Sequence, residues 1–443
     1  MLVAVLRQRI LELAVQGQLV PQRPEDGTAE ELYQQIQQEK KKLIAAGKLK
    51  KQKPLPSIKE EEIPFNIPKS WQWCRIGELF TMQAGKFISA NNISEIGREG
   101  LFPCYGGNGC RGYVDKYNRE GDFPLIGRQG ALCGNIKRAK GKFYATEHAV
   151  VVDTYAKTNV DWVCAALTAL HLNEYATATA QPGLAVSKIM EVLIPLPPMA
   201  EQRRIAQKAN VLFAELDAIE QSQEKVAAIQ AELNKCILER AIQGKLVPQC
   251  PEEGTAEDLY QQIQEEKKKL IAAGKLKKEK PLSPITEEEI PFDIPESWKW
   301  VRLSAIVYNV GDKTNQILAK EVKKEGAYPA VSQGQELIDG YTDKSEKVIR
   351  DIPLVMFGDH TRNVKFVDFP FVISADGTKF MKAICVAPKY LYYWMKCAAE
   401  RMRNRGYARH YSLLKKELVP LPPLAEQQRI VEKIEEMLAF CAR

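Results

Sequence analysis

Polar and basic side chains gather in glycine-rich loops in two separate stretches of the chain. Arginine and lysine pair with guanine edges and phosphates, and asparagine and glutamine pair with adenine edges. Any one of these residues fits an ordinary solvated surface equally well, but the set, with tyrosines interleaved, indicates a surface that contacts nucleic acid. The candidates in the first stretch are Tyr105, Asn108, Arg111, Tyr113, Arg128, Gln129, Lys137, Arg138, Lys140 and Lys142, followed by Gln181 and Ser187. Those in the second stretch are Gln333, Gln335, Tyr341, His360, Thr361, Arg362, Asn363 and Lys365, followed by Arg405, Arg409, His410 and Ser412.

A search of the sequence for catalytic motifs finds none. It contains no GxxxxGK[ST] phosphate-binding loop and no (N/D)PPY methyltransferase motif. The four histidines are scattered without metal-ligand spacing, and His148, at a strand start, is interpreted as structural. Cys104 and Cys110 are the only close cysteine pair, and we expect thiols there rather than a zinc site. The sequence therefore predicts no catalytic site and no metal site in this chain.

The composition is that of a soluble globular chain, with 45% hydrophobic and 27% charged residues. A net charge of +7 is compatible with nucleic-acid binding but does not establish it. No apolar run reaches the ~20 residues of a membrane span, and the apolar start of the chain is too short for a signal peptide. We therefore expect a cytoplasmic protein with no membrane contact and with reduced cysteines.

A long internal repeat flanks the two loop-rich stretches. Residues 10–73 align without gaps with residues 237–300, and 50 of these 64 positions are identical. A second repeated block pairs IPLPPMAEQRRI at 194–205 with VPLPPLAEQQRI at 419–430. The inserts between the blocks have nearly equal lengths but very different sequences. We infer that the flanks do one job twice, whereas the inserts do the same kind of job on different targets.

One long helix is predicted at residues 200–244, bounded by prolines and a glycine. At ~1.5 Å per residue it would be roughly 65 Å long. The helices at the two chain ends match its two halves in sequence, so we expect them to pack antiparallel against it as a coiled coil. The expected packing stripe consists of Ile205, Leu212, Ile219, Val226 and Leu233 in the central helix, faced by Ile430, Ile434 and Leu438. Ala209, Leu216 and Ile237 are expected to widen it.

The predicted fold class is α+β, with two α/β domains joined by this long antiparallel coiled-coil scaffold in a pseudo-two-fold internal repeat. Each insert has short strands, glycine-rich turns and a late helix. The predicted boundaries are 1–62 for the first half-helix with a capped helix and linker, 63–194 for the first domain, 195–289 for the central helix with a second capped helix and linker, 290–419 for the second domain, and 420–443 for the last half-helix.

Several motifs occur twice at matching spacings. They are the PLPPxAEQ blocks at 195–202 and 420–427, the helix exits at 14–22 and 241–249, and the IPxSWxW domain entries. With these motifs, and with the insert segments GGNGCRGYV, PLIGRQGALCGN and MFGDHTRNVKFVDFPFVIS, the chain resembles the specificity subunit of type I restriction–modification systems over essentially its whole length.

This resemblance implies that each domain is a target recognition domain for one half of a split, asymmetric DNA sequence, and that the helices set the spacer. It implies double-stranded DNA, two modification (N6-adenine methyltransferase) subunits and two restriction (translocase and nuclease) subunits as partners. It also implies a non-catalytic chain without a cofactor, because S-adenosylmethionine, ATP and Mg²⁺ are used by the partner subunits. The alternatives are a non-enzymatic adaptor that binds protein or glycan, and an enzyme acting alone, against which the missing motifs argue.

A short capped helix in each repeat, at 28–46 and 255–273, goes beyond the family pattern. Its lysine run, Lys40 to Lys42 in the first copy, is expected to be a solvated face, with a DNA contact as the alternative. Its role stays open between a contact with the methyltransferase subunit and a contact with the scaffold.

Overall fold

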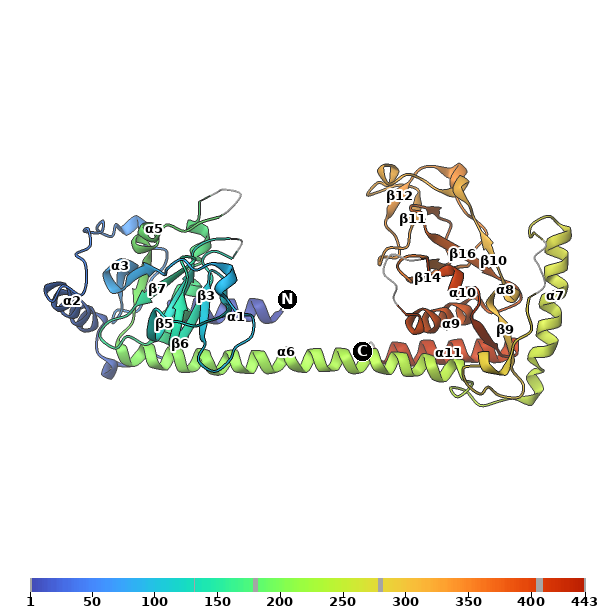
Figure 1. Ribbon diagram of the computed structural model, residues 1–443, viewed down its shortest axis with the longest axis horizontal. Helices are drawn as coiled ribbons and strands as arrows, with labels where there is room; N and C mark the ends of the chain where they lie inside the picture. The colour runs from blue at the N-terminus through green and yellow to red at the C-terminus, as the bar shows by residue number, and fades with distance from the viewer. Residues whose placement is uncertain (1, 131, 178–181, 278–281, 404–408, 442–443) are drawn as a thin grey trace. The chain divides into compact units, whose positions relative to one another are not determined.

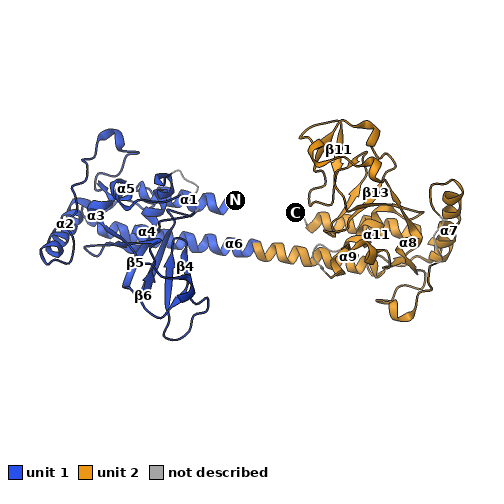
Figure 2. Ribbon diagram, turned by 45° about the horizontal axis from the view of Figure 1, so that its top comes forward, with its two compact units in different colours: residues 1–223 blue, residues 224–443 orange. Residues whose placement is uncertain are grey.

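The computed structural model describes residues 2–130, 132–177, 182–277, 282–403 and 409–441. The chain forms two compact units, unit 1 (residues 1–223) and unit 2 (residues 224–443), coloured separately in Figure 2. Helix α6 (Met199–Ile242) crosses the boundary between them. Among the described residues, no helix is both long enough and apolar enough to span a membrane.

Unit 1 contains a six-stranded sheet and a separate two-stranded ribbon (Figure 1). The six strands have the order β2-β7-β5-β6-β3-β4, and their pairings are antiparallel except for the parallel pair β3–β6. The ribbon β1–β8 brings the entry and the exit of the domain together. The strands are β1 (Gln72–Arg75), β2 (Thr81–Ala84), β3 (Phe102–Gly106), β4 (Gly109–Val114), β5 (Arg119–Gly127), β6 (Ile136–Ala145), β7 (Ala149–Asp153) and β8 (Leu193–Leu196). The helices are α1 (Leu2–Val15), α2 (Ala29–Ala45), α3 (Ile76–Leu79), α4 (Val160–Ala169) and α5 (Val186–Glu191).

Unit 2 repeats this plan with shorter strands and a divided sheet. Its four-stranded sheet has the order β10-β16-β13-β14, its three-stranded sheet has the order β12-β11-β15, and β9 pairs with β17 as the entry-and-exit ribbon. The strands are β9 (Lys299–Arg302), β10 (Val307–Val310), β11 (Tyr328–Val331), β12 (Gly340–Thr342), β13 (Leu354–Gly358), β14 (Val364–Val367), β15 (Val372–Ile373), β16 (Thr378–Ala383) and β17 (Leu418–Leu421). The helices are α7 (Ala256–Ala272), α8 (Leu303–Ile306), α9 (Pro388–Arg401), α10 (Tyr411–Leu414) and α11 (Leu424–Cys441).

Central strand β7 is buried on both faces, which is why its sequence is continuously apolar rather than alternating. Val150 and Val152 pack in the core that contains α4, whereas Val151 packs in a second core. That second core also contains Leu125 and Phe143. Strand β13 divides its side chains between two cores of unit 2 in the same way. Each central strand is therefore held from both sides, and the loops at its ends start from a fixed position.

The terminal helices pack against the parts of α6 that belong to their own units. In unit 1, Arg7 of α1 forms an ion pair with Asp217 of α6. In unit 2, Gln230 of α6 donates a hydrogen bond of 2.6 Å to the carbonyl of Cys441, the last residue of α11. The start of α11 lies instead beside the residues that follow α6, so the two helices run antiparallel within unit 2 (Figure 1). The predicted antiparallel scaffold is confirmed in this respect.

The packing seam on α6 differs from the predicted stripe. Ile219, Val226 and Leu233 are 46%, 54% and 43% exposed. The buried residues Ala209 and Leu216 lie seven apart in a register three residues earlier. A heptad has two apolar positions, and the sequence pattern alone does not say which of them a partner helix covers. The predicted positions form the flank of the seam rather than its centre.

At the ends of the scaffold the expected residues are covered. Ile205 and Ile430 are fully buried and Ile434 is 1% exposed, whereas Leu212 and Leu438 are half-buried. Ile430 and Ile434 share the main core of unit 2 with residues from the end of α6.

A buried polar cluster is built twice from the repeated AEQ and SWxW motifs. Glu201 is 1% exposed and accepts hydrogen bonds from the Trp71 indole nitrogen at 2.8 Å and from the Gln22 amide at 2.5 Å. The equivalent Glu426 accepts from an indole at 2.9 Å and from an amide at 2.6 Å. Burial raises the pKa of both carboxyl groups. Because a buried carboxylate needs several donors, this cluster explains why these residue types recur together.

The neighbouring glutamine of each AEQ motif positions a domain helix. Gln202 donates to the Pro197 carbonyl at 3.1 Å and accepts from the Asn159 backbone N–H, before α4, at 3.1 Å. Gln427 makes the equivalent bonds, before α9, at 2.9 Å and 2.8 Å. The repeated motif thus ties the long helices to both recognition inserts.

The capped helices pack on their own units. Leu32 and Ile36 of α2 are buried in the main core of unit 1, which also contains residues of β1 and α3. Thr28 caps the helix as predicted, since its hydroxyl accepts from the Glu31 backbone N–H at 3.4 Å. Helix α7 has the same cap and buries the equivalent residues in unit 2.

The first residue of the lysine run is buried, and the expectation that the whole run faces solvent was wrong for Lys40. It is 7% exposed, and its ammonium donates to the last carbonyls of α3, at Gly77 (2.9 Å) and Glu78 (3.0 Å). Burial lowers its pKa to about 8. In unit 2, Lys267 donates to the Ser304 carbonyl of α8 at 2.9 Å. The first lysine of each run therefore caps a helix C-terminus, where carbonyls lack partners within the helix.

Candidate nucleic-acid interface

Four loops meet at one rim of the unit 1 sheet. The Arg128 backbone N–H donates to the His148 carbonyl at 2.8 Å, and the Arg128 carbonyl accepts from Leu184 at 2.9 Å. The Asn135 amide donates to the Asn108 side-chain oxygen at 3.2 Å and joins the fourth loop to the others. We name this rim edge 1; it consists of residues 106–111, 128–130, 132–137, 146–148 and 182–184.

Close backbone approach holds edge 1 together. Gly127, at the end of β5, faces Gly107 in the turn between β3 and β4. A Cβ atom at Gly127 would overlap the Gly107 carbonyl oxygen. Only glycine leaves room for two backbones at this separation, which is why the glycine-rich segments are needed here.

Edge 1 gathers five of the twelve residues predicted for the first insert. The Arg111 side chain lies over Gly106, and Lys137 lies over Gly109 with its nearest carbon 3.6 Å from a Cβ built there. Gln129 pairs with Gly183 in an isolated bridge. The predicted residues that the structure brings together here are Asn108, Arg111, Arg128, Gln129 and Lys137.

Other predicted residues of the first insert lie away from edge 1. Tyr105 packs edge-on against Phe143, with ring centroids 5.6 Å apart. Tyr113 lies against the 88–94 segment and lines a cavity of about 420 Å³. Lys140 is exposed opposite Asp122 along the β5–β6 ribbon. These three side chains are not part of the loop cluster.

The last described candidates of the first insert, together with Ser412 of the second, lie apart from one another. Lys142 lies 4.9 Å over the Tyr117 ring, near the end of the β5–β6 ribbon remote from edge 1. Ser187 and Ser412 are exposed on α5 and α10. Gln181 lies outside the described residues.

Arg138 has an internal partner set. Its guanidinium donates to Asp122 of β5 at 2.7 Å and forms an ion pair with Asp161 of α4. The hydrogen bonds with Asp122 raise the pKa of Arg138 and lower the pKa of Asp122. Its donors are committed to holding β6 against α4, so the structure gives Arg138 a supporting position rather than a place in edge 1.

Unit 2 builds the same rim around Asp359, the equivalent of Arg128. The Asp359 backbone N–H donates to the Gly377 carbonyl at 2.7 Å, and its carbonyl accepts from His410 at 2.9 Å. Its carboxylate also accepts from the Tyr411 backbone N–H at 2.7 Å. We name this rim edge 2; it consists of residues 332–336, 359–365, 375–377 and 409–411.

Gln333 is the centre of edge 2. Its carbonyl accepts from the Thr361 hydroxyl at 2.8 Å and from the Asn363 amide at 2.8 Å. Its own side chain accepts from the His360 backbone N–H at 3.1 Å and donates to the Asp376 carbonyl at 2.9 Å. The predicted residues of this segment are thus brought together, and several of them hold each other in place.

Two predicted basic residues of edge 2 point inward. Lys365 is 6% exposed and donates to the carbonyls of Ser332, at 2.7 Å, and Glu336, and burial lowers its pKa. Arg362 has a left-handed backbone with φ of 61°. Its guanidinium donates to the Met402 carbonyl at 2.6 Å, just after α9. Both residues brace the loop, a use that their charge alone does not reveal.

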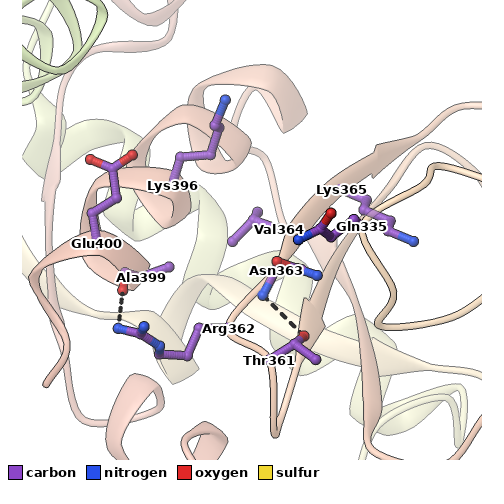
Figure 3. Close-up of a pocket in the computed structure, with 9 residues that line it drawn as sticks. All are labelled: Gln335, Thr361, Arg362, Asn363, Val364, Lys365, Lys396, Ala399 and Glu400. Atoms are coloured by element: carbon purple, nitrogen blue, oxygen red, sulfur yellow. Dashed lines mark hydrogen bonds between the residues drawn. The ribbon is translucent and has the colours of Figure 1, made fainter. Parts of the chain in front are cut away.

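A cavity of about 490 Å³ opens beside edge 2, with loop residues on one side and α9 on the other (Figure 3). Lys396, Ala399 and Glu400 of α9 line it, and the sequence analysis did not single them out. The signal that could have found Lys396 and Glu400 is their four-residue spacing, which places two charges on one helix face. From the loops the lining residues are Gln335, Thr361, Arg362, Asn363, Val364 and Lys365.

The later candidates of unit 2 divide between buried and exposed positions. His410 is fully buried, with its Nδ1 atom 3.0 Å from the Asp359 carbonyl oxygen. Its neighbour Arg409 is exposed on edge 2. Tyr341 lies in β12, outside edge 2, where its backbone exchanges hydrogen bonds with the segment before β11. Arg405 lies outside the described residues.

Glu147 and His148 are further residues of edge 1. The sequence analysis assigned His148 a structural role, and its carbonyl does hold Arg128. Its Nε2 atom is 3.2 Å from the Glu147 carboxylate, and the two side chains are 37% and 30% exposed. The signal for this pair is its position directly before central strand β7. Asp376 and Gly377 occupy the equivalent position before β16.

Residues 68–228 and 295–442 match the family described as Type I restriction modification DNA specificity domain. The two matches cover more than half of the chain, and each contains one of the rims. The chain therefore belongs to this family of type I restriction–modification specificity subunits.

Individual relatives agree with this assignment. The chain is 49% identical over 153 residues to the type I restriction enzyme EcoprrI specificity subunit of Escherichia coli, a match that covers 34% of this chain and 37% of the relative. It is 27% identical over 529 residues to the EcoAI specificity subunit of Escherichia coli, covering 98% and 89%. A solved structure titled "Structural basis underlying complex assembly and conformational transition of the type I R-M system" matches with a TM-score of 0.53 at 18% identity, covering 86% of this chain and 93% of that one. It supports the same fold.

Proposed function

We propose that this chain reads the DNA target of a type I restriction–modification complex, with edge 1 reading one half of a split sequence and edge 2 reading the other. The observation that carries the proposal is the duplicated rim. Equivalent loops are held by equivalent backbone hydrogen bonds at Arg128 and Asp359, but they present different side chains. A shared frame with different contact residues suits two different half-sequences.

The two rims offer different chemistry to a duplex. Edge 1 presents Arg111, Arg128 and Lys137, whose cationic groups suit guanine edges and phosphates. Edge 2 presents Gln335, Thr361 and Arg409, which are exposed, and it keeps Lys365 inside. We therefore expect the first half-site to contribute more of the salt-dependent affinity.

Chemistry on the DNA belongs to partner subunits in this proposal. Two modification subunits methylate adenine with S-adenosylmethionine, and two restriction subunits use ATP and Mg²⁺, while this chain supplies recognition in the cytoplasm. Helix α6 is continuous from unit 1 into unit 2, so its length sets the spacer between the half-sites. Helix α6 and the repeated AEQ motifs support this separation of recognition from catalysis, because they connect the two inserts without belonging to either rim.

The proposal is tested by exchanging residues 74–193 for the insert of another specificity subunit and sequencing the methylated adenines in host DNA. We expect one half-site to change and the other to remain. The reciprocal exchange of residues 301–418 is the matched control and should change only the other half. A change in both half-sites after either exchange would refute modular reading, and a complex without any DNA sequence preference would refute the proposed function.

A further inference from the structure

The outer faces of α2 and α7 are nearly identical although they face solvent. Of the 17 residues in each helix, 15 are the same. Four exposed lysines at the end of each helix and just beyond it are also the same. We name them lysine cluster 1 and lysine cluster 2; they are Lys41, Lys42, Lys48 and Lys50 in unit 1, and Lys268, Lys269, Lys275 and Lys277 in unit 2.

A recent duplication, with too little time for the two copies to diverge, does not explain why the two helices are so similar. The scaffold segments 200–218 and 425–443 belong to the same duplication, and only seven of their 19 positions are identical. Exposed positions that serve only folding tolerate most substitutions. Folding alone therefore does not account for the identity of the exposed faces of α2 and α7.

The lysine clusters lie away from the recognition rims. Edge 1 includes His148, directly before β7, whereas Glu39 of α2 accepts a hydrogen bond from the Ala156 backbone N–H, just after β7, at 2.6 Å. The five residues of β7 separate the two places by about 17 Å at ~3.4 Å per residue. Figure 1 shows α2 and β3 on different sides of unit 1. Lysine cluster 1 is therefore not part of edge 1.

Uncharged residues on the same faces are also the same in both copies. Gln34, Gln35 and Ala45 are exposed, as are their counterparts in α7. A phosphate backbone requires only positive charge. Matching glutamines and alanines add shape and hydrogen-bonding groups, which a folded protein surface can recognise.

We infer that lysine clusters 1 and 2 dock two copies of one protein subunit through an acidic surface, one copy on each unit. The inference rests on the proposed function, in which the complex contains the modification subunit twice, and it assigns α2 and α7 as docking helices for that subunit. Lys40 and Lys267 anchor these helices to α3 and α8. A partner bound there is thus fixed relative to the sheet that carries each rim.

The test replaces the four lysines of cluster 1 with glutamine in the full chain, and likewise those of cluster 2. Native mass spectrometry then counts the modification subunits bound. Each variant should bind its subunit at the altered unit at least tenfold more weakly, so that complexes with one subunit replace complexes with two. The combined variant should carry none at the same concentration. The control changes four other exposed lysines of unit 1 to glutamine, Lys69, Lys116, Lys157 and Lys188, and should keep two.

Circular dichroism and binding of a target duplex show whether each variant is folded. Two subunits bound to a folded combined variant would overturn the inference. So would an unchanged count with weaker, less salt-dependent duplex binding, because the lysines would then contact DNA. The proposed function fails separately, if the wild-type complex shows no sequence preference while its subunit count still responds to the lysine clusters.

Discussion

The two recognition domains hold equivalent strands against equivalent helices by different interactions. In unit 1, Arg138 of β6 forms an ion pair with Asp161 of α4. In unit 2, Phe366 of β14 packs against Tyr392 of α9, with ring centroids 5.8 Å apart. Both strands pair antiparallel with the equivalent neighbour, β5 in unit 1 and β13 in unit 2. The frame of the domain therefore specifies where a strand meets a helix, but not by which chemistry.

A pair of lysines shows the same contrast at the rims. Lys137 pairs with Leu125 two residues before Gly127, and Lys365 pairs with Met356 two residues before Gly358. Lys137 is exposed, whereas Lys365 is buried under carbonyl groups. Equal residues at equivalent positions thus face solvent in one unit and support a loop in the other.

The AEQ anchors behave in the opposite way. Glu201 and Glu426 keep the same residue types, partners and burial in both units. The contrast between these motifs and the rims shows which positions keep the same residue in both units. Residues that join an insert to the scaffold are held constant, and residues that shape a rim are free to differ.

The largest difference in stability between the units is expected when Gly127→Ala in unit 1 is compared with Gly358→Ala in unit 2. The new methyl at position 127 meets a backbone carbonyl, which cannot move without opening edge 1. At position 358 the methyl meets side-chain atoms only: the Thr361 hydroxyl, which can rotate at the cost of its hydrogen bond to the Gln333 carbonyl, and the Cβ of Gln333, which must shift. We expect Gly127→Ala to cost about 3 kcal/mol in unit 1 and Gly358→Ala about 1 kcal/mol in unit 2. Hydrogen exchange of β5 and β13 peptides measures both, and equal losses would contradict the comparison.

A smaller difference in stability is expected when Lys365→Met in unit 2 is compared with Lys137→Met in unit 1. Removing the Lys365 ammonium leaves two buried carbonyl groups without their donor and should destabilise unit 2 by about 2 kcal/mol. Lys137→Met should change stability by less than about 0.5 kcal/mol. It should instead weaken DNA binding and lower the salt slope by about one. Urea unfolding and duplex titrations at several salt concentrations separate the two outcomes; a reversal of the roles would refute the contrast.

The smallest expected difference is in how the stability of the strand–helix contacts depends on salt concentration. Arg138→Gln should destabilise the β6–α4 contact by about 1 kcal/mol at low salt, and by less at high salt, because the ion pair is partly exposed and screened. Phe366→Leu should cost about the same at every salt concentration, since aromatic packing is not screened. Hydrogen exchange of β6 and β14 at two salt concentrations checks this, and parallel salt responses would count against it.

Much of the architecture could be predicted from the sequence because its signals are local or pairwise. Near-identity at a fixed offset predicted the two units, and the Thr28 cap predicted the start of α2. Glycine-rich loops pointed to Arg128, Gln333 and Asn363, which lie together at sheet ends because turns between strands collect there; their contact with DNA stays a prediction.

Other assignments needed the tertiary structure. An apolar heptad has two possible seams, and only packing showed that Ala209 and Leu216, rather than Ile219, are covered. Lysine and arginine look alike in a sequence whether they meet solvent or a carbonyl. Strand pairing between distant segments decided that Lys40 and Lys365 are buried, because burial depends on neighbours that the local sequence does not specify.

The sequence by itself therefore determined that this protein is a duplicated frame with two different inserts. The tertiary structure decided which charged residues support that frame and which remain exposed at its rims.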